Sequence, residues 1–305
     1  MTESVISESR RRLIAKLQRE IGPTVLAALD DPAVVEVMLN ADGRLWQDKI
    51  GEGMTEIGSM DALTADSLLA TIATLAGKEI REDNPAIHTA LPLNGERFAG
   101  VIPPAADRAV FAIRKRPKKI FTLDDYIQRG IMTADIAESI KLAVRTHKNI
   151  LVAGGTGSGK STLTNAVLYY LGEFIGGKER LIIIEDVPEL QCAAPNVLFL
   201  TASPSRNQNQ LLFDCMRLRP DRIMLGEVRD SSAHTLLKAW NTGHPGGIST
   251  IHADTAETTL ERLDDLCQEA GVPSQMKAID RAIGMVLYIE KDDLGNRKVL
   301  PPFYP

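Results

Sequence analysis

The sequence predicts an α/β protein in which a smaller α+β domain precedes a C-terminal domain with a mostly parallel sheet. From Thr133 onward, strand-like and helix-like segments alternate, which is typical of a parallel sheet covered by helices on both faces. Residues 154–161 match G-x-x-x-x-G-K-S/T, the pattern of a P-loop. The length of 305 residues fits two domains of ordinary size. We therefore expect domains at 1–115 and 133–305, joined by a linker over 116–132.

The composition is that of a globular protein, with 44% hydrophobic and 25% charged residues. A net charge of -5 gives no general attraction to nucleic acid, so we expect no direct sequence-specific nucleic-acid binding. No apolar run approaches the roughly 18 residues that span a bilayer, and the first residues lack the apolar stretch of a secretory signal. The three cysteines are far apart and form no C-x-x-C pair, which argues against a paired-cysteine zinc site and favours the cytoplasm.

The first residues allow two interpretations. Leu13, Leu17 and Ile21 are four residues apart beside the basic run 10–12, as in a basic amphipathic helix that touches a membrane surface. The alternative, which we favour, is a first helix that packs on its own domain.

The remaining elements of the N-terminal domain follow from apolar patterning and turn residues. Asp42-Gly43 and Asn94-Gly95 are typical hairpin turns, and Pro103-Pro104 interrupts the strands. The basic, proline-containing run 114–119 is interpreted as a solvated connector and is weak as a nucleic-acid site. The expected elements are a helix over 7–29, strands over 34–40 and 44–47, a helix over 64–76 with Thr64 as its N-cap, and strands over 87–91, 97–102 and 109–113.

In the C-terminal domain, a strand, the P-loop and a helix follow one another, which is the context that the P-loop pattern requires. The helices are expected over 133–146, 161–174, 207–217, 231–242 and 255–270, and the strands over 150–153, 180–184, 196–200, 222–225, 247–251, 285–289 and 297–300 with a turn at 292–296. Ligands of such a sheet bind at the carboxyl ends of the strands.

The P-loop predicts a site for ATP and Mg²⁺. Glycines leave the backbone free to bend so that its N–H groups point at an anion. Lys160 is expected to reach the β- and γ-phosphates and the Ser161 hydroxyl to bind Mg²⁺. The predicted nucleotide-binding residues are Gly154, Gly155, Thr156, Gly157, Ser158, Gly159, Lys160, Ser161 and Thr162.

Acidic residues end two of the predicted strands. We expect Glu185 to be the general base that polarises the water attacking the γ-phosphate, and Asp186 to help hold that water or the magnesium shell. Two acids that merely face water are the alternative. Gly226 and Glu227 follow an apolar run in a Walker-B-like arrangement, in which the Glu227 carboxylate acts on Mg²⁺ through a bound water.

Hydrolysis also needs groups that sense and neutralise the γ-phosphate. His252 follows a predicted strand and is a candidate to hydrogen-bond that phosphate, although a lone histidine is as often structural. Arg97 and Arg114 lie on predicted strands of the first domain, with Arg116 close by. We consider Arg97 and Arg114 as arginines that close over the nucleotide from the same or another subunit.

Several of these motifs together resemble the secretion ATPases of type II and type IV systems. The segments are GGTGSGKST, IIIEDVPEL, RPDRIMLGEVR and GHPGGISTIHAD, in that order, with LPLNGERF and AVFAIRK in the first domain. Within this superfamily the chain looks most like the conjugal-transfer ATPases of the TrbB type. Its three scattered cysteines cannot build the four-cysteine metal site that members of the type II branch often carry.

This resemblance implies a RecA-like C-terminal domain and a homohexameric ring at the cytoplasmic face of the inner membrane, with nucleotide between the two domains. It places Lys160 and Ser161 on phosphate and Mg²⁺, Glu185 as the catalytic acid, and Glu227 and His252 in the Walker-B and histidine motifs. Arg97 and Arg114 match the arginines that contact the γ-phosphate. The implied partners are inner-membrane components and other ATPases of the secretion system.

The leading hypothesis is a hexameric Mg·ATP-driven motor of conjugative type IV secretion that powers pilus biogenesis and DNA or protein transfer. A pilus retraction motor would use the same chemistry. A nucleotide-gated assembly scaffold with little turnover is a third hypothesis, which Glu185 argues against. A RecA-like DNA-binding ATPase is disfavoured by the acidic charge balance.

Overall fold

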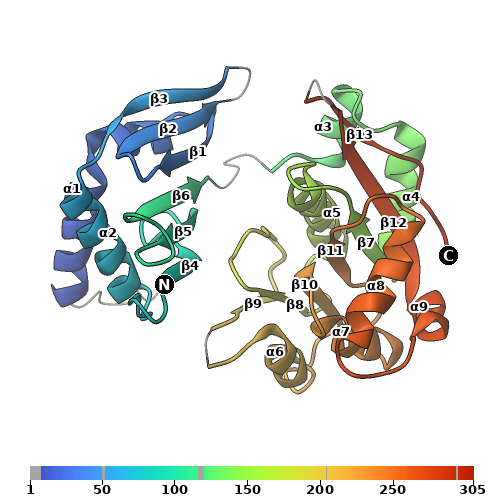
Figure 1. Ribbon diagram of the computed structural model, residues 1–305. Coiled ribbons are helices and arrows are strands. Elements are labelled where there is room, and N and C mark those ends of the chain that lie inside the picture. The colour runs from blue at the N-terminus through green and yellow to red at the C-terminus, as the bar shows by residue number, and fades with distance from the viewer. Residues whose placement is uncertain (1–7, 50–51, 116–119, 204, 293–294) are drawn as a thin grey trace. The chain divides into compact units, whose positions relative to one another are not determined.

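Two β-sheets organise the chain, one in each of two units that divide between Lys118 and Lys119 (Figure 1). The computed structural model describes residues 8–49, 52–115, 120–203, 205–292 and 295–305. Four sequence predictions fall at least partly outside these ranges. They are the start of the first helix at Ser7, residues 116–119 of the linker, the candidate Arg116, and positions 293–294 of the predicted turn.

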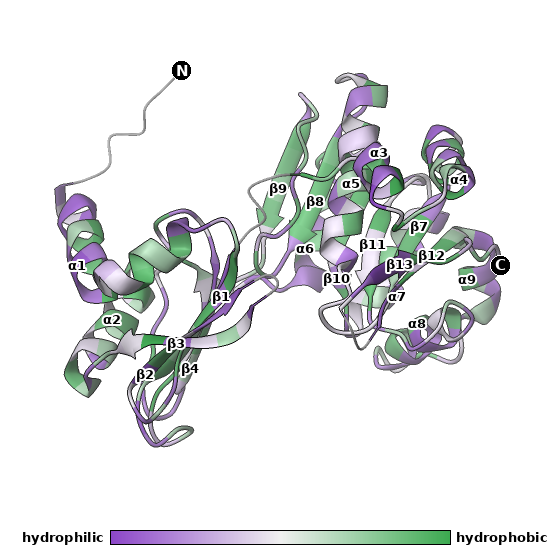
Figure 2. Ribbon diagram, turned by 90° about the horizontal axis from the view of Figure 1, so that it is seen from above, coloured by the Kyte–Doolittle hydropathy of each residue, from purple (hydrophilic) through white to green (hydrophobic). Residues whose placement is uncertain are grey.

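The first unit contains a six-stranded antiparallel sheet with the order β3-β2-β1-β6-β5-β4. Two helices pack on it through a core that includes Leu17, Leu69 and Phe98. Figure 2 shows that the green, hydrophobic sides of these helices turn toward each other and the sheet. The elements are α1 (Glu8–Asp30), β1 (Val34–Leu39), β2 (Arg44–Lys49), β3 (Gly53–Ser59), α2 (Ala62–Leu75), β4 (Ala86–Ala90), β5 (Arg97–Val101) and β6 (Val110–Arg114).

Helix α1 packs on its own domain, so the interpretation we favoured for this segment is confirmed. Leu17 and Ile21 are 0% and 1% exposed in the core of the first unit. The helix is broken at Gly22, whose φ of 76° and ψ of 160° are not helical, and it resumes at Pro23. Proline lacks the N–H that a continuous helix needs, whereas glycine accepts a positive φ, so the pair permits this break.

Two predictions for the first unit were wrong in detail. Asp61, not Thr64, is the N-cap of α2, because its carboxylate accepts hydrogen bonds from the Thr64 backbone N–H at 3.0 Å and hydroxyl at 2.6 Å. The strand β3 was not predicted. Its residues are mostly exposed and its glycines weaken the strand pattern, so pairing with β2 determines its conformation.

The second unit contains a seven-stranded sheet with the order β13-β12-β7-β11-β10-β8-β9, in which only the β12–β13 pair is antiparallel. The predicted α/β class with a mostly parallel sheet is therefore confirmed. The strands are β7 (Asn149–Ala153), β8 (Leu181–Glu185), β9 (Val197–Thr201), β10 (Arg222–Val228), β11 (Ile248–Ile251), β12 (Ile283–Lys291) and β13 (Arg297–Val299). The helices are α3 (Leu123–Gln128), α4 (Ala134–Arg145), α5 (Lys160–Ile175), α6 (Gln208–Cys215), α7 (Ser232–Asn241), α8 (Thr258–Gln268) and α9 (Met276–Ala282).

Helices cover both faces of this sheet, and each face has its own core. Successive residues of β7 alternate between them: Ile150 and Val152 pack with α3, α4 and α5, while Leu151 and Ala153 pack with α6, α7, α8 and α9. Burial on both faces explains why β7 and β8 read as continuous apolar runs. The crossovers bring the carboxyl ends of β7, β8, β10 and β11 to one edge.

Part of the predicted linker belongs to the packed second unit. Its residues 123–128 form α3, which begins with a capping box between Thr122 and Asp125. Leu123, Tyr126 and Met132 are buried in the same core as α4 and α5. The helix α9 was also not predicted; its seven residues give too short a pattern.

Candidate nucleotide-binding site

The P-loop joins the carboxyl end of β7 to the first residue of α5. Gly154, Gly157 and Gly159 have φ values of 153°, 71° and 106°, a region that favours glycine. A Cβ on Gly154 would lie only 2.3 Å from the Ile289 carbonyl oxygen, so this turn fits tightly against β12. Gly155 instead faces open space, as a cradle for a ligand requires.

Two buried side chains of the loop are suited to an anion. Lys160 is 8% exposed, and its ammonium donates to the carbonyl oxygens of Gly154 and Gly155, both at 2.9 Å. The Ser158 hydroxyl is buried and has no hydrogen-bond partner among the described residues. Because α5 begins at Lys160 after a glycine, its first N–H groups have no side-chain cap and remain suited to a phosphate.

His252 connects Lys160 to Glu227. Its Nδ1 lies 3.2 Å from Lys160 Nζ, and its Nε2 lies 2.9 Å from Glu227 Oε1. Partial burial and the charge of Lys160 lower the pKa of His252, although Glu227 acts in the opposite direction. The imidazole is therefore neutral at pH 7; it accepts a hydrogen bond from Lys160 at Nδ1 and donates its Nε2–H to Glu227.

Glu227 lies where β10 departs from a regular ladder. The pairing of β10 with β11 shifts register between Leu225 and Glu227, and the Thr250 hydroxyl donates to the intervening Gly226 carbonyl at 2.7 Å. A Cβ on Gly226 would lie 2.8 Å from Glu185 Cγ. The glycine of this motif thus makes room for Glu185, a reason for it that the sequence alone did not provide.

Glu185 is the last residue of β8 and is 4% exposed. Its Oε1 accepts hydrogen bonds from the backbone N–H groups of Glu189 and Leu190, at 2.7 and 2.8 Å. The predicted alternative, an acid that merely faces water, does not describe this buried, fixed carboxylate. A carboxylate with one oxygen fixed by the backbone is suited to orient a water.

Sequence reasoning missed Glu189, four residues after Glu185. The Ser161 hydroxyl donates to Glu189 Oε2 at 2.9 Å. Asn165, one turn further along α5, donates to the Glu189 carbonyl at 3.3 Å and accepts from the Gln191 N–H at 2.8 Å. The available signal was a third acid in EDVPE, but its sequence position does not reveal which helix the segment contacts.

Sequence reasoning also missed Arg229. It forms ion pairs with Asp186 and, at 3.8 Å, with Glu227. Asp186 was predicted to help hold water or the magnesium shell, but the partner described for it is this arginine. Arg229 follows β10, and no spacing rule in the sequence linked it to an acid that follows β8.

Arg97 and Arg114 lie in the first unit, on β5 and β6. The antiparallel register pairs them directly opposite each other, and Glu36 of β1 is the partner of Arg114 on its other side. Like charges at directly opposite positions repel. Their contact with nucleotide stays a prediction.

The oxygen donors at the P-loop fit magnesium. Mg²⁺ is bound through one or two protein oxygens together with phosphates and waters, not by an all-protein cage. No group of three or more His, Cys, Asp or Glu among the described residues could hold a metal ion by itself. The Ser161 hydroxyl beside a carboxylate is the kind of donor set that a nucleotide-bound Mg²⁺ uses.

The fold and the geometry of this edge fit a nucleotide-binding protein, and comparisons with known proteins identify the family. Residues 88–288 match the type II/IV secretion system protein family. The chain is 43% identical over 289 residues to the probable conjugal transfer protein TrbB of Sinorhizobium fredii, covering 95% of this chain and 89% of that protein. It is 31% identical over 290 residues to the type IV secretion system protein VirB11 of Bartonella quintana, covering 81% and 80%.

Solved structures agree with this assignment. The VirB11 ATPase from the Brucella suis type IV secretion system, in complex with sulphate, has a TM-score of 0.51 at 27% identity and covers 98% of this chain and 97% of that one. The pilus retraction motor PilT with bound ADP has a TM-score of 0.66 at 19% identity, covers 92% and 82%, and shares the fold. The chain belongs to the type II/IV secretion system protein family and is similar to the TrbB conjugal transfer proteins.

Proposed function

We propose that this chain is the subunit of a homohexameric motor that hydrolyses Mg·ATP in a conjugative type IV secretion system. Its work would be pilus biogenesis and the transfer of DNA or protein. The similarity to TrbB over nearly the whole chain supports the system, and the P-loop supports the nucleotide. The observation that supports hydrolysis is Glu185, buried at the end of β8 with one carboxylate oxygen held by two N–H groups.

The proposed chemistry assigns one task to each group. Lys160 and Ser158 bind phosphate oxygens, and Ser161 holds Mg²⁺, which supplies positive charge at the phosphates. Glu185 takes up a proton from the attacking water through its outer oxygen. Glu227 acts on Mg²⁺ through a bound water, and His252 responds when a phosphate engages Lys160. Arg97 and Arg114 neutralise the charge that develops on the γ-phosphate.

The test is phosphate release by Glu185→Gln. Glutamine keeps an oxygen that accepts both N–H bonds, so the loop is retained while the base is removed. General-base catalysis contributes about 10²–10⁴-fold, and we expect kcat to fall by that factor. The ADP Kd should stay within about threefold, since the phosphate cradle is intact. A second variant, Lys160→Ala, should abolish ADP binding as well as turnover.

Equal turnover of Glu185→Gln and the unaltered protein would instead support a nucleotide-gated scaffold. Undiminished hydrolysis by Lys160→Ala would show that this loop is not the site. The mass of the purified protein with and without Mg·ATP tests the ring: a hexamer is expected with nucleotide, and a monomer in both conditions would contradict it.

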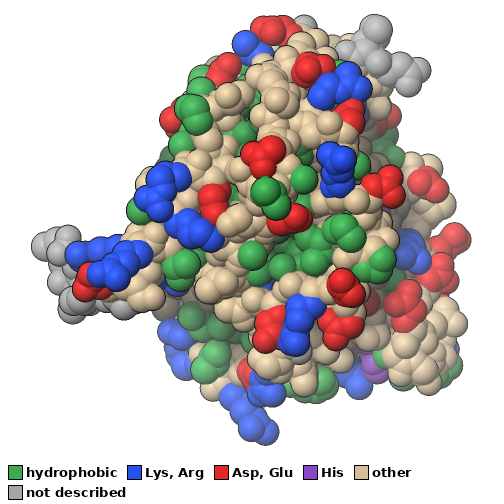
Figure 3. Space-filling model, turned by 60° about the vertical axis from the view of Figure 1, so that its left-hand side comes forward, with side chains coloured by type: hydrophobic (Ala, Val, Ile, Leu, Met, Phe, Trp, Pro, Cys, Tyr) green, Lys and Arg blue, Asp and Glu red, His purple; other side chains and the backbone are tan. Residues whose placement is uncertain are grey.

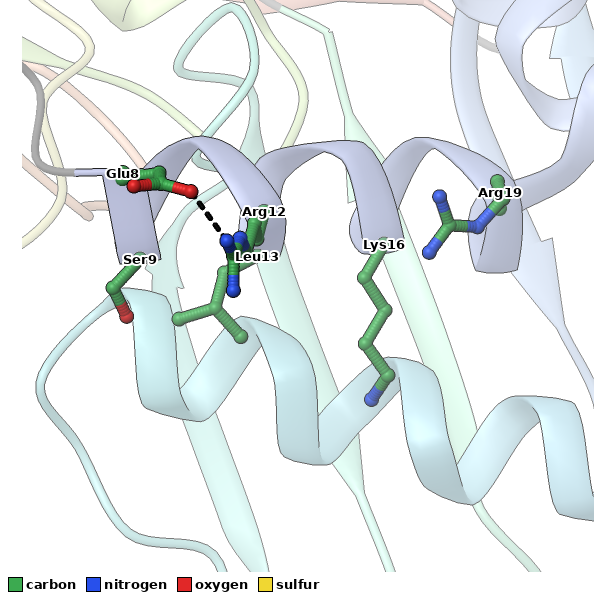
Figure 4. Close-up of a pocket in the computed structure, with 6 residues that line it drawn as sticks. All are labelled: Glu8, Ser9, Arg12, Leu13, Lys16 and Arg19. Carbon is green, nitrogen blue, oxygen red and sulfur yellow. Dashed lines mark hydrogen bonds and ion pairs between the residues drawn. The ribbon is translucent and has the colours of Figure 1, made fainter.

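We also propose that α1, whose apolar side packs on its own domain, makes a peripheral contact with an anionic membrane surface through its exposed cations. The exposed cations of this helix include Arg11, Arg12 and Arg19. Figure 4 shows Arg12 beside Glu8 at the start of α1 and Lys16 pointing toward α2. These residues line a surface hollow of about 480 Å³. In Figure 3, Lys and Arg side chains gather at the left-hand edge, while both signs mix elsewhere on this face.

Each cation near an anionic bilayer contributes about 1 kcal/mol. The triple variant Arg11→Ala, Arg12→Ala, Arg19→Ala should therefore lose most of its sedimentation with phosphatidylglycerol vesicles, and phosphatidylcholine vesicles should bind neither protein. Equal sedimentation of both proteins with the anionic vesicles would refute this contact. No helix among the described residues is long and apolar enough to cross a membrane.

A further inference from the structure

The edge of the second unit's sheet opposite the P-loop carries a surface hollow that the proposed hydrolysis does not use. The strands β7, β11 and β12 begin at this edge, so their first residues lie on the side away from the P-loop. Residues of α4, α7, α9, the start of β12 and the C-terminal segment line this amino-edge hollow, whose volume is about 570 Å³. Figures 1 and 2 both show the C-terminal end between α4 and α9. Segments far apart in the sequence thus build one surface within a single unit.

Large apolar side chains remain exposed in and beside the amino-edge hollow. Leu142 of α4 and Tyr304 line it and are 60% and 57% exposed, and the ring of Trp240 also lines it. Phe174 of α5, on the other side of α4, is 45% exposed. Single exposed apolar residues are ordinary, but a group of them rimmed by charge is typical of an interaction site.

Arg145, three residues after Leu142 on α4, is held in place by aromatic side chains of α5. Its Nε donates to the Tyr170 hydroxyl at 2.6 Å, and its guanidinium carbon lies 5.7 and 6.0 Å from the ring centroids of Tyr170 and Phe174. Those two rings are themselves stacked, 6.4 Å apart. Among the described residues, the Nη1 and Nη2 atoms have no hydrogen-bond partner. An arginine fixed in this way presents its planar fork to a carboxylate and loses little rotamer entropy on binding.

The charges of this surface are predominantly positive, although the whole chain has a net charge of -5. Its exposed acids are largely engaged: Glu138 pairs with Lys141 at 2.8 Å, and Glu173 interacts with Tyr169. Among the residues that line the hollow, Asp280 is the acidic one. The cations for which the described part of the chain offers no ion-pair partner are Arg145, Lys148 and Arg281. This surface therefore complements a negatively charged ligand.

We propose that this surface docks an acidic segment of a partner protein, with a carboxylate on Arg145 and an apolar side chain in the amino-edge hollow beside Leu142. Exposed aromatic and arginine side chains around a hollow are the groups that anchor protein partners. A nucleic acid or a bilayer would need a row of cations along a backbone or a flat surface, whereas here a few cations surround an apolar hollow. The inference goes beyond the proposed hydrolysis, whose groups lie at the opposite edge of the sheet.

The experiment measures binding of fluorescein-labelled heptapeptides to the full-length protein by fluorescence anisotropy at low ionic strength. In the probes, one Leu, Phe or Trp is flanked by Glu on both sides. We expect at least one probe to bind saturably, with a Kd on the order of 0.1 mM. Matched peptides with Gln in place of Glu, or Gly in place of the apolar residue, should bind at least about tenfold more weakly, because each lacks one of the two anchors.

Variants of the protein test the two anchoring residues separately. Arg145→Ala should weaken binding of the acidic probe at least about tenfold, and Leu142→Ser at least about fivefold. The matched control is Arg129→Ala, because Arg129 is also exposed and lies over an aromatic ring, 4.3 Å from the centroid of Phe121, at another place in the unit. It should change the Kd less than about twofold. Circular dichroism checks folding; if Arg145→Ala is unfolded, Arg145→Lys, which keeps the charge but loses the fork, replaces it and should also weaken binding.

Photo-cross-linking locates the probe: with benzoyl-phenylalanine as its apolar residue, cross-links should fall within 142–148, 280–285 or 304–305, and cross-links confined to other segments would overturn the inference. So would the absence of saturable binding, equal binding of the Gln peptides, or an unchanged Kd in a folded Arg145 variant. Leu142→Ser should keep the mass of the unaltered protein and its sedimentation with phosphatidylglycerol vesicles. A lower mass would assign this surface to a second copy of the chain, and lost sedimentation to a membrane; either result would refute the proposed partner, as would Arg145-dependent binding of a labelled oligonucleotide.

Discussion

The Lys160–His252 bond predicts that one substitution tightens nucleotide binding while it slows hydrolysis. Lys160 donates to two carbonyl oxygens and to His252 Nδ1. A phosphate that engages the ammonium competes with these acceptors. A hydrogen bond to a charged group contributes about 1.5–3 kcal/mol, which corresponds to about 10–150-fold in an equilibrium constant.

At 3.2 Å and with the imidazole 47% exposed, the lower end of that range applies. We expect His252→Ala to bind ADP up to about tenfold more tightly, since a competing acceptor is lost. Its hydrolysis should be slower, because Glu227 also loses its Nε2–H partner. Calorimetric titration with ADP and a phosphate-release assay measure the two effects.

Two amide variants identify which ring nitrogen is responsible. Asparagine places its amide near Nδ1 and can still accept from Lys160, so His252→Asn should keep the ADP affinity of the unaltered protein. Glutamine reaches toward Nε2, so His252→Gln should bind ADP as His252→Ala does. Weaker ADP binding by His252→Ala would refute the reasoning, as it would mean that the histidine holds Lys160 in its nucleotide-bound position.

Three other predictions follow from the geometry. Arg114→Ala should slow hydrolysis more than it weakens ADP binding, since ADP lacks the γ-phosphate; matching losses would contradict that role. Gly154→Ala should destabilise the second unit by about 1–3 kcal/mol in chemical denaturation, because its Cβ would meet a backbone carbonyl. Glu179→Gln should destabilise the same unit by about 3–5 kcal/mol, because Arg222, which is 0% exposed, loses its anionic partner 2.5 Å away. Burial alone would raise the pKa of Glu179, but the hydrogen bonds and charge of Arg222 outweigh burial and lower that pKa below 4.5. The pair therefore stabilises the folded protein above pH 4.5, and this stabilisation is lost as the pH falls through the lowered pKa of Glu179.

The two stability predictions have matched controls. Gly155→Ala places a methyl group in open space and should leave stability within about 0.5 kcal/mol. Asp214→Asn breaks an exposed arginine pair, with Arg206 at 2.9 Å, and should cost at most about 1 kcal/mol. Fluorescence of Trp240 in a Trp46→Phe background reports the second unit alone, since the chain has two tryptophans. If the free energy of unfolding of Glu179→Gln lay within about 1 kcal/mol of that of Asp214→Asn, the buried ion pair would not be needed for stability.

The sequence was most informative where one physical pattern determines the outcome. The apolar runs of β7 and β8 identify strands buried on both faces, and the glycines before Lys160 identify a tight turn with positive φ values. Elements with short or mixed sequence patterns, such as β3 and α9, were not predicted, because tertiary packing and strand pairing determine their conformation. The kink at Gly22 shows the reverse case: a glycine followed by proline was a local signal that the helical periodicity around it obscured.

The partners of the site residues could not be predicted in the same way. The sequence places Asp186 directly after Glu185, but β8 ends at Glu185 and Asp186 lies on the bend that follows, so the two adjacent carboxylates have different partners. Asp186 consequently pairs with Arg229, whereas Glu189, four residues further on, returns to α5 and meets Ser161. The path of a loop after a strand decides such pairings, and periodicity contains no information about it.

The charged side chains at the P-loop edge of the sheet give a physical reason why the proposed hydrolysis would use arginines of the first unit. The described side chains around the P-loop are four carboxylates and three cations, namely Glu185, Asp186, Glu189, Glu227, Lys160, Arg229 and Arg297. One of the cations, Arg229, is already paired with acids. A triphosphate brought to this edge therefore adds negative charge beside these carboxylates, and Mg²⁺ would compensate part of it. Transition-state charge on the γ-phosphate needs a further cation, which is the role we assign to Arg97 and Arg114 on neighbouring strands of the first unit.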